Sequence, residues 1–79
     1  MNVLLFARSR DLLGADRIVV DPPEPATVGE LRQRLRQRYP TLDGLLGKSA
    51  FAVNDEFAAD DVRIPLGAEV ALLPPVSGG

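Results

Sequence analysis

The stretch "TVGELRQRLRQRYP", Thr27–Pro40, carries the clearest helix pattern in this 79-residue chain. Thr27 and Glu30 have the spacing of a capping box, in which each side chain accepts a hydrogen bond from the other residue's backbone N–H. Apolar side chains recur at helical spacing at Val28, Leu31, Leu35 and Tyr39. Pro40 disfavours helical geometry at the residue before it. We predict a helix that begins after Thr27, ends near Tyr39 and buries one apolar stripe.

Four arginines lie on the same predicted helix: Arg32, Arg34, Arg36 and Arg38. The apolar stripe divides them into two pairs, so they do not form one basic face. We interpret their aliphatic stems as covering the edges of the stripe, with docking onto an acidic partner as the alternative. The formal net charge of −2 argues against nucleic acid as the main partner.

Short apolar runs on both sides of this helix predict strands. The expected strands are 2–8, 17–21, 50–54, 57–61 and 69–73. Gly14 is the expected turn between the first two strands, which would form a hairpin-like pair. We expect residues 41–49 to form a compact loop or a short 3₁₀ turn that tucks its leucines under the sheet edge. The order β-β-α-β-β-β predicts an α+β fold in which a single helix lies across a small mixed sheet.

The first and last of these strands contain "VLLFA" and "VALL", which are apolar at every position. Continuous apolar runs are typical of strands that are buried on both faces. One helix can cover only one face of the sheet, so we predict that a partner contacts the other face. Loops that cover this face are the alternative. The sequence leaves open whether Phe6, Phe51 or Phe57 lies on it.

The residue types that are missing limit the chemistry. The chain has no Cys and no His, which removes disulfides, thiolate nucleophiles, imidazole bases and the metal ligands of both types. We interpret the adjacent carboxylates Asp55-Glu56 and Asp60-Asp61 as solvated turn residues. We therefore expect no metal site, no bound cofactor and no self-sufficient enzyme. The apolar run at the N-terminus is too short for a membrane span or a signal peptide, which favours the cytoplasm.

The last apolar run leads into "PPVSGG", which we expect to be a flexible tail attached to a domain of residues 1–73. The tail residues are Pro74, Pro75, Val76, Ser77, Gly78 and Gly79. The prolines would hold the chain extended, and the glycines could enter a channel too narrow for a Cβ. If a partner enzyme used ATP to activate the carboxylate of Gly79, the tail would become a carried acyl group. An inert, frayed tail is the alternative.

The element order and the terminal Gly-Gly resemble the ubiquitin-like β-grasp proteins. More narrowly, the chain resembles the small, sulfur-carrying subunits of molybdopterin synthase. The resemblance covers nearly the whole chain, in "VLLFARSRDLLG", "TVGELRQRLRQRYP", "VNDEF" and "GAEVALLPPVSGG", of which the last is the most specific. Two positions depart mildly from the family pattern: Ala68 replaces an acidic residue, and Asp11 replaces a Glu.

The resemblance implies a role in molybdenum cofactor synthesis. An ATP-dependent, E1-like activating enzyme would adenylate Gly79, and a sulfur donor would convert the adenylate to a thiocarboxylate. The large subunit of molybdopterin synthase would then accept the tail in its active site and pass the sulfur to the pterin precursor. The resemblance also implies that the carrier and the large subunit form a heterotetramer. The chain itself would be a non-catalytic carrier, and ATP would belong to the activating enzyme.

Three alternatives stay open. The chain could be a β-grasp sulfur carrier that serves thiamine synthesis or tRNA thiolation, or it could be conjugated to lysines through the same activated Gly79. A plain interaction module with an inert tail is the third reading, and it belongs to a different functional class.

Overall fold

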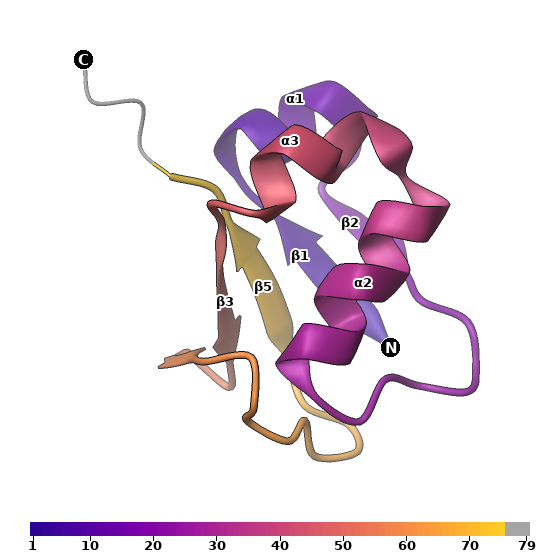
Figure 1. Ribbon diagram of the computed structural model, residues 1–79, viewed down its shortest axis with the longest axis vertical. Helices are drawn as coiled ribbons and strands as arrows, with labels where there is room; N and C mark the ends of the chain where they lie inside the picture. The colour runs from indigo at the N-terminus through magenta and orange to yellow at the C-terminus, as the bar shows by residue number, and fades with distance from the viewer. Residues whose placement is uncertain (76–79) are drawn as a thin grey trace.

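The computed structural model describes residues 1–75, and its centre is a five-stranded mixed sheet (Figure 1). The strands are β1 (Asn2–Leu5), β2 (Arg17–Val19), β3 (Ala50–Val53), β4 (Glu56–Ala58) and β5 (Val70–Leu73). Their order across the sheet is β2-β1-β5-β3-β4, with β5 parallel to β1 and antiparallel to β3. The last strand in the sequence therefore lies in the middle of the sheet, with a hydrogen-bonded neighbour on each side.

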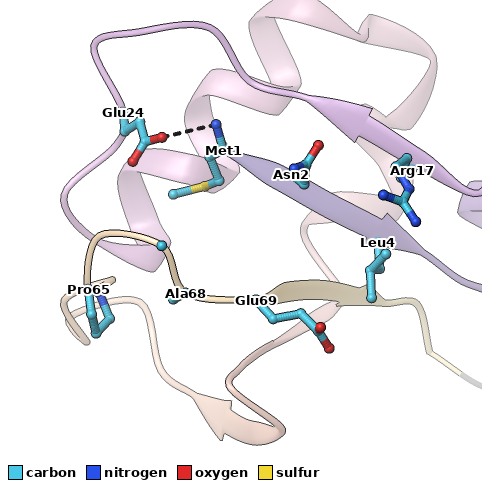
Figure 2. Close-up of a pocket in the computed structure, with 9 residues that line it drawn as sticks. Met1, Asn2, Leu4, Arg17, Glu24, Pro65, Ala68 and Glu69 are labelled. Atoms are coloured by element: carbon cyan, nitrogen blue, oxygen red, sulfur yellow. Dashed lines mark ion pairs between the residues drawn. The ribbon is translucent and has the colours of Figure 1, made fainter.

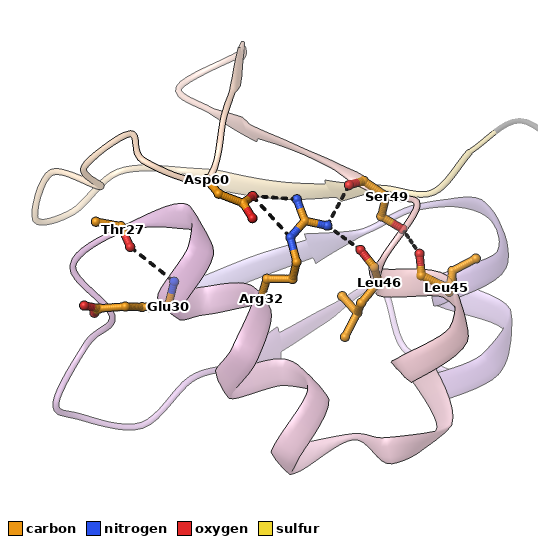
Figure 3. Close-up of polar contacts among 7 residues, drawn as sticks. All are labelled: Thr27, Glu30, Arg32, Leu45, Leu46, Ser49 and Asp60. Carbon is orange, nitrogen blue, oxygen red and sulfur yellow. Dashed lines mark hydrogen bonds and ion pairs between the residues drawn. The ribbon is translucent and has the colours of Figure 1, made fainter.

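All helices lie on one face of this sheet (Figures 1 and 3). They are α1 (Ala7–Leu13), α2 (Val28–Arg38), α3 (Asp43–Leu46) and the 3₁₀ helix η1 (Pro40–Leu42). The predicted helix is confirmed as α2, and the predicted 3₁₀ turn is confirmed as η1, which α3 then extends. No helix within the described residues is long and apolar enough to cross a membrane.

The capping box at the start of α2 is confirmed for one of its two hydrogen bonds (Figure 3). The Thr27 hydroxyl oxygen accepts from the backbone N–H of Glu30 at 3.2 Å. The Glu30 carboxylate, however, accepts from the backbone N–H of Ala26 at 2.8 Å, one residue before the predicted donor. Both bonds satisfy backbone donors at the start of α2 with side chains of the same short segment.

The expectation of a single helix is wrong, because residues 7–13 form α1 between the first two strands. Gly14 does reverse the chain, but it does so as the left-handed cap of α1, with φ 65° and its N–H donating to Arg10 O at 2.8 Å. Ser9 is fully buried in α1, and its hydroxyl donates to Phe6 O at 2.7 Å. The expected antiparallel pairing of the two strands is confirmed.

The core lies between the sheet and the helices. The predicted stripe of α2 supplies Val28, Leu31 and Leu35, none of which is exposed to solvent. Leu42 of η1 and Leu46 of α3 are equally buried. These leucines close one end of the core, in agreement with the prediction that residues 41–49 tuck them under the sheet.

The β3–β4 hairpin turns at Asn54 and Asp55, which both have positive φ, of 50° and 67°. Two consecutive left-handed residues are typical of the type I′ turn, whose twist matches that of the flanking strands. A tight turn was predicted at Asp55-Glu56, and the structure places it one residue earlier, because Glu56 already begins β4 at one border of the sheet.

Candidate functional site

The face of the sheet opposite the helices carries a row of side chains that crosses all five strands. The strand register aligns them in the order Arg17, Leu4, Ala71, Ala52 and Phe57. A second pair on the same face, Ala50 and Leu73, lies next to this row toward the end of β5. We call these seven residues the open face, because every helix of the described residues packs on the other side.

The open face is mostly apolar and partly accessible. Leu4, Ala71 and Leu73 are half-buried, and the Phe57 side chain at the β4 border is 79% exposed. The structure places the three phenylalanines, whose positions the sequence left open, in three different environments. Phe51 is fully buried in the core, Phe57 lies on the open face, and Phe6 is exposed just beyond the end of β1. An apolar surface of this kind on a small domain is typical of a protein-binding site.

One end of the open face is polar (Figure 2). Three side chains project there and help to line a cavity of about 410 Å³. They are Arg17 of β2, Leu4 of β1 and Glu69, which immediately precedes β5. Glu24 borders the same cavity and forms an ion pair of 3.0 Å with the amino group of Met1. The remaining surface of the open face, toward the end of β5, is apolar, so the face has a charged end and an apolar end.

The root of the predicted tail lies at the apolar end of the open face. Leu72 is aligned with Leu5 of β1 and with Phe51 of β3, and Leu73 is aligned with Ala50. Strand β5 ends at Leu73, after which Pro74 is half-buried and Pro75 is exposed. The predicted site residues Val76, Ser77, Gly78 and Gly79 lie outside the described residues. The structure thus brings the tail root and the apolar surface together.

Strand β3, which pairs with the tail root, is held by the side chain of Arg32 (Figure 3). Its guanidinium donates to the carbonyls of Leu46 and Ser49, the latter at 2.9 Å, and to Asp60 Oδ1 at 2.8 and 3.2 Å. It also lies over the Phe51 ring, 5.1 Å from the centroid. Arg32 therefore joins α2 to α3, to the start of β3 and to the loop that follows β4.

The other three arginines of α2 have separate roles. Arg34 donates to the carbonyls of Asp21 and Pro23, and Arg36 pairs with Asp43 at 3.3 Å. Arg38 lies over the ring of the neighbouring Tyr39, 5.4 Å from its centroid. This spread of directions agrees with the prediction that the run forms no single basic face.

The sequence did not predict Arg32 as the group that fixes β3. Its acceptors lie far along the chain, with Asp60 separated from it by 28 residues. Asp60 had been interpreted as a solvated turn residue, and it is indeed exposed, but it also accepts this ion pair. Across the described residues, no group of three or more acidic side chains is placed to hold a metal ion.

Comparisons with known proteins extend these observations. A family model described as the ThiS family matches residues 3–79. A molybdopterin synthase sulfur carrier subunit of Dictyostelium discoideum is 38% identical, over 99% of this chain and 94% of the relative.

Solved structures agree in fold. The crystal structure of SAMP1 from Haloferax volcanii has a TM-score of 0.78 at 35% identity, covering 99% of this chain and 97% of that one. A complex of subunits 1 and 2 of molybdopterin-converting factor from Helicobacter pylori contains a chain with a TM-score of 0.68 at 28% identity, covering 99% and 96%. The predicted α+β, ubiquitin-like β-grasp fold is thereby confirmed. Since the family model spans almost the whole chain and a relative this similar matches it from end to end, the protein belongs to the ThiS family, together with the molybdopterin synthase sulfur carrier subunits.

Proposed function

We propose that this protein is a sulfur carrier for molybdenum cofactor synthesis and that the carboxylate of Gly79 carries the sulfur. The observation that supports this most directly is the position of the tail root, at the end of the central strand and beside the apolar end of the open face. The sulfur carrier name of the Dictyostelium relative supports the cargo. The absence of Cys and His from the sequence leaves the terminal carboxylate as the group most suited to activation.

The proposed chemistry takes place on partner enzymes. On an E1-like enzyme, a carboxylate oxygen of Gly79 attacks the α-phosphorus of ATP, and pyrophosphate leaves. A sulfur nucleophile then attacks the carbonyl carbon of the acyl-adenylate, and AMP leaves as the thiocarboxylate forms. ATP is thus a substrate of the activating enzyme. The carrier contributes an unhindered acyl end, since glycine has no side chain to obstruct either attack.

We propose the large subunit of molybdopterin synthase as the partner that covers the open face. The solved Helicobacter complex joins two subunits of molybdopterin-converting factor, and one of its chains shares this fold. The anchored β5 would fix the tail root while the partner's surface covers Leu4, Ala71 and Phe57. The six residues from Pro74 to Gly79 would then extend into the partner's active site, over roughly 20 Å at about 3.1–3.3 Å per residue. A heterotetramer of two carriers and two large subunits is the assembly that we propose.

The first test measures sulfur loading. The purified full chain is incubated with the activating enzyme, ATP and sulfide, and its intact mass is measured. We expect a mass increase that corresponds to the replacement of one oxygen by sulfur, located at Gly79 by fragmentation. A variant with one extra residue after Gly79 should remain unloaded, because the reacting carbon is displaced from its attack position. Loading of the extended variant without trimming would contradict the proposal.

The second test concerns the open face. Phe57→Ser should weaken binding to the large subunit by about tenfold or more, because an exposed aromatic anchor is lost. Leu66→Ser is the matched control, since Leu66 is 90% exposed but lies in a turn outside the strands. Titration calorimetry with the large subunit gives both affinities. Equal weakening by the two substitutions would contradict the proposed docking face.

Conjugation to lysines is a second candidate, because a small archaeal modifier protein, SAMP1, has the same fold and 35% identity. Both functions use an activated Gly79, and they differ in the nucleophile that attacks it. Incubation of the adenylating system with lysine-containing acceptors separates them. A stable amide adduct would favour conjugation, whereas a thiocarboxylate that the large subunit consumes would favour the carrier. Thiamine synthesis and tRNA thiolation would instead require sulfur transfer without that subunit.

A further inference from the structure

The border of the sheet formed by β2 has backbone groups without a strand partner among residues 1–75. On its inner side, Asp16 O accepts from Leu5 N–H at 2.8 Å, and Val20 N–H donates to Met1 O at 2.7 Å. Alternate residues of an antiparallel strand bond to the same neighbour. The N–H and C=O groups of Arg17 and Val19 therefore point away from β1, toward the outside of the sheet.

A groove runs between this border and α2. It encloses a cavity of about 110 Å³, lined in part by Val19, Val20, Arg34, Leu35, Arg38 and Tyr39. Val20 and Leu35 are buried, whereas Val19 is 61% exposed. The groove thus combines an apolar lining with a row of strand hydrogen-bonding groups, and it is separate from both the tail root and the apolar end of the open face.

The cations of this groove differ from the other arginines of α2. Within residues 1–75, Arg32 and Arg36 form ion pairs with carboxylates, whereas Arg34 and Arg38 form none. Arg34 is oriented by its bonds to the carbonyls of Asp21 and Pro23. Asp21 also borders the groove at that end. An acidic ligand should therefore bind at the other end, where Arg38 lies one helical turn further along α2.

We propose that the β2–α2 groove binds an extended, acidic segment of a protein partner, which adds to the sheet as a strand next to β2. Side chains of an added strand alternate between the two faces of the sheet. Acidic side chains on the helix side would meet Arg38, and aliphatic side chains on the other side would pack beside Val19. The main-chain bonds to Arg17 and Val19 would supply affinity, and the charge would set the register. This site uses neither Gly79 nor Phe57, so it does not depend on the proposed function.

The test uses the full chain and a short, end-blocked peptide in which valine and aspartate alternate. In NMR titrations we expect shifts of the Arg17 and Val19 amide signals and slower hydrogen exchange at both. Arg38→Gln should weaken binding by about tenfold, the usual effect of losing a hydrogen bond between charged groups. Arg36→Gln is the matched control, because Arg36 lies on the same helix but pairs with Asp43, and it should bind as the unmodified chain does. A peptide with asparagine in place of aspartate should also bind about tenfold more weakly.

Several results would overturn the proposal. One is the absence of shifts at Arg17 and Val19, and another is equal binding by the Arg38→Gln variant or by the asparagine peptide. Concentration-dependent shifts of the same amides without peptide would assign the border to a second copy of the chain. Binding of single-stranded RNA that shifts the arginine side chains but leaves the β2 amides unchanged would assign the groove to phosphates.

Discussion

The two faces of the sheet are built from alternating residues of the same strands, but they differ in the size of the side chains. The helix-covered face carries Phe51, Leu72 and Val3, which are fully buried. The open face carries three alanines in or next to its centre, and its larger side chains, Arg17, Leu4, Leu73 and Phe57, lie around them. Large interlocking side chains fill a core, whereas small ones leave a flat surface that a partner can approach closely. The comparison separates residues needed for folding from residues available for binding.

The largest expected effect on stability comes from replacing a phenylalanine on each face of the sheet, which tests whether only the helix-covered face is needed for folding. Phe51→Ala should lower the free energy of unfolding by about 3–5 kcal/mol, because it removes a buried aromatic ring and leaves a cavity. Phe57→Ala should change it by less than about 0.5 kcal/mol, since the side chain is already exposed. Urea denaturation of both variants measures the difference. Similar losses for the two would mean that Phe57 is also part of the folding core.

An intermediate effect is expected at the connection between the helices and β3. Arg32→Ala should cost about 1–3 kcal/mol, because it leaves the carbonyls of Leu46 and Ser49 without their donor. Arg38→Ala, on the same helix, should cost less than about 0.5 kcal/mol. The measurement is again urea denaturation, supplemented by hydrogen exchange at Ala50. An unchanged exchange rate at Ala50 in the Arg32 variant would show that this side chain does not hold the start of β3.

The smallest effect concerns the point where the chain leaves the sheet for the helical layer. Ala7 has φ 51°, in the left-handed region that costs a residue with a Cβ roughly 1 kcal/mol. Ala7→Gly should therefore raise the free energy of unfolding by up to about 1 kcal/mol. Ala15→Gly is the control, and it should lower the free energy of unfolding, because Ala15 is not among the residues with positive φ. Thermal unfolding measures the stability of both variants. A loss of stability in both would contradict the proposed backbone strain at Ala7.

The sequence-based predictions were accurate where the physical cause of a feature lies within a short segment of the chain, and less accurate where it depends on distant residues. The signals for α2 all lie within one segment: its Thr27 cap, its apolar stripe and Pro40, and the helix was predicted to within one residue. Helix α1 was missed because Gly14 is an equally good hairpin turn and helix cap. The helix has no side-chain cap bond at its start, and its short apolar face packs only in the folded protein.

Features that depend on distant pairing could not be predicted from local patterns. The sorting of Phe51 and Phe57 onto opposite faces depends on a register that aligns Phe51 with Leu72 and Ala52 with Phe57. The bonds of Arg32 depend on the return of the chain at Asp60. The tail prediction rests on composition and family resemblance, and its residues from Val76 onward stay a prediction.

The parallel pairing of β1 and β5 also has a mechanical consequence. Val3 is aligned with Val70, and β5 is bonded along its other side to β3. A pull on the chain beyond Pro75 acts along the axis of β5 and loads both rows of hydrogen bonds in shear. These bonds must then break together, unlike the bonds of a hairpin that is peeled open one pair at a time. The domain therefore resists traction on the end of β5 most strongly along the axis of that strand.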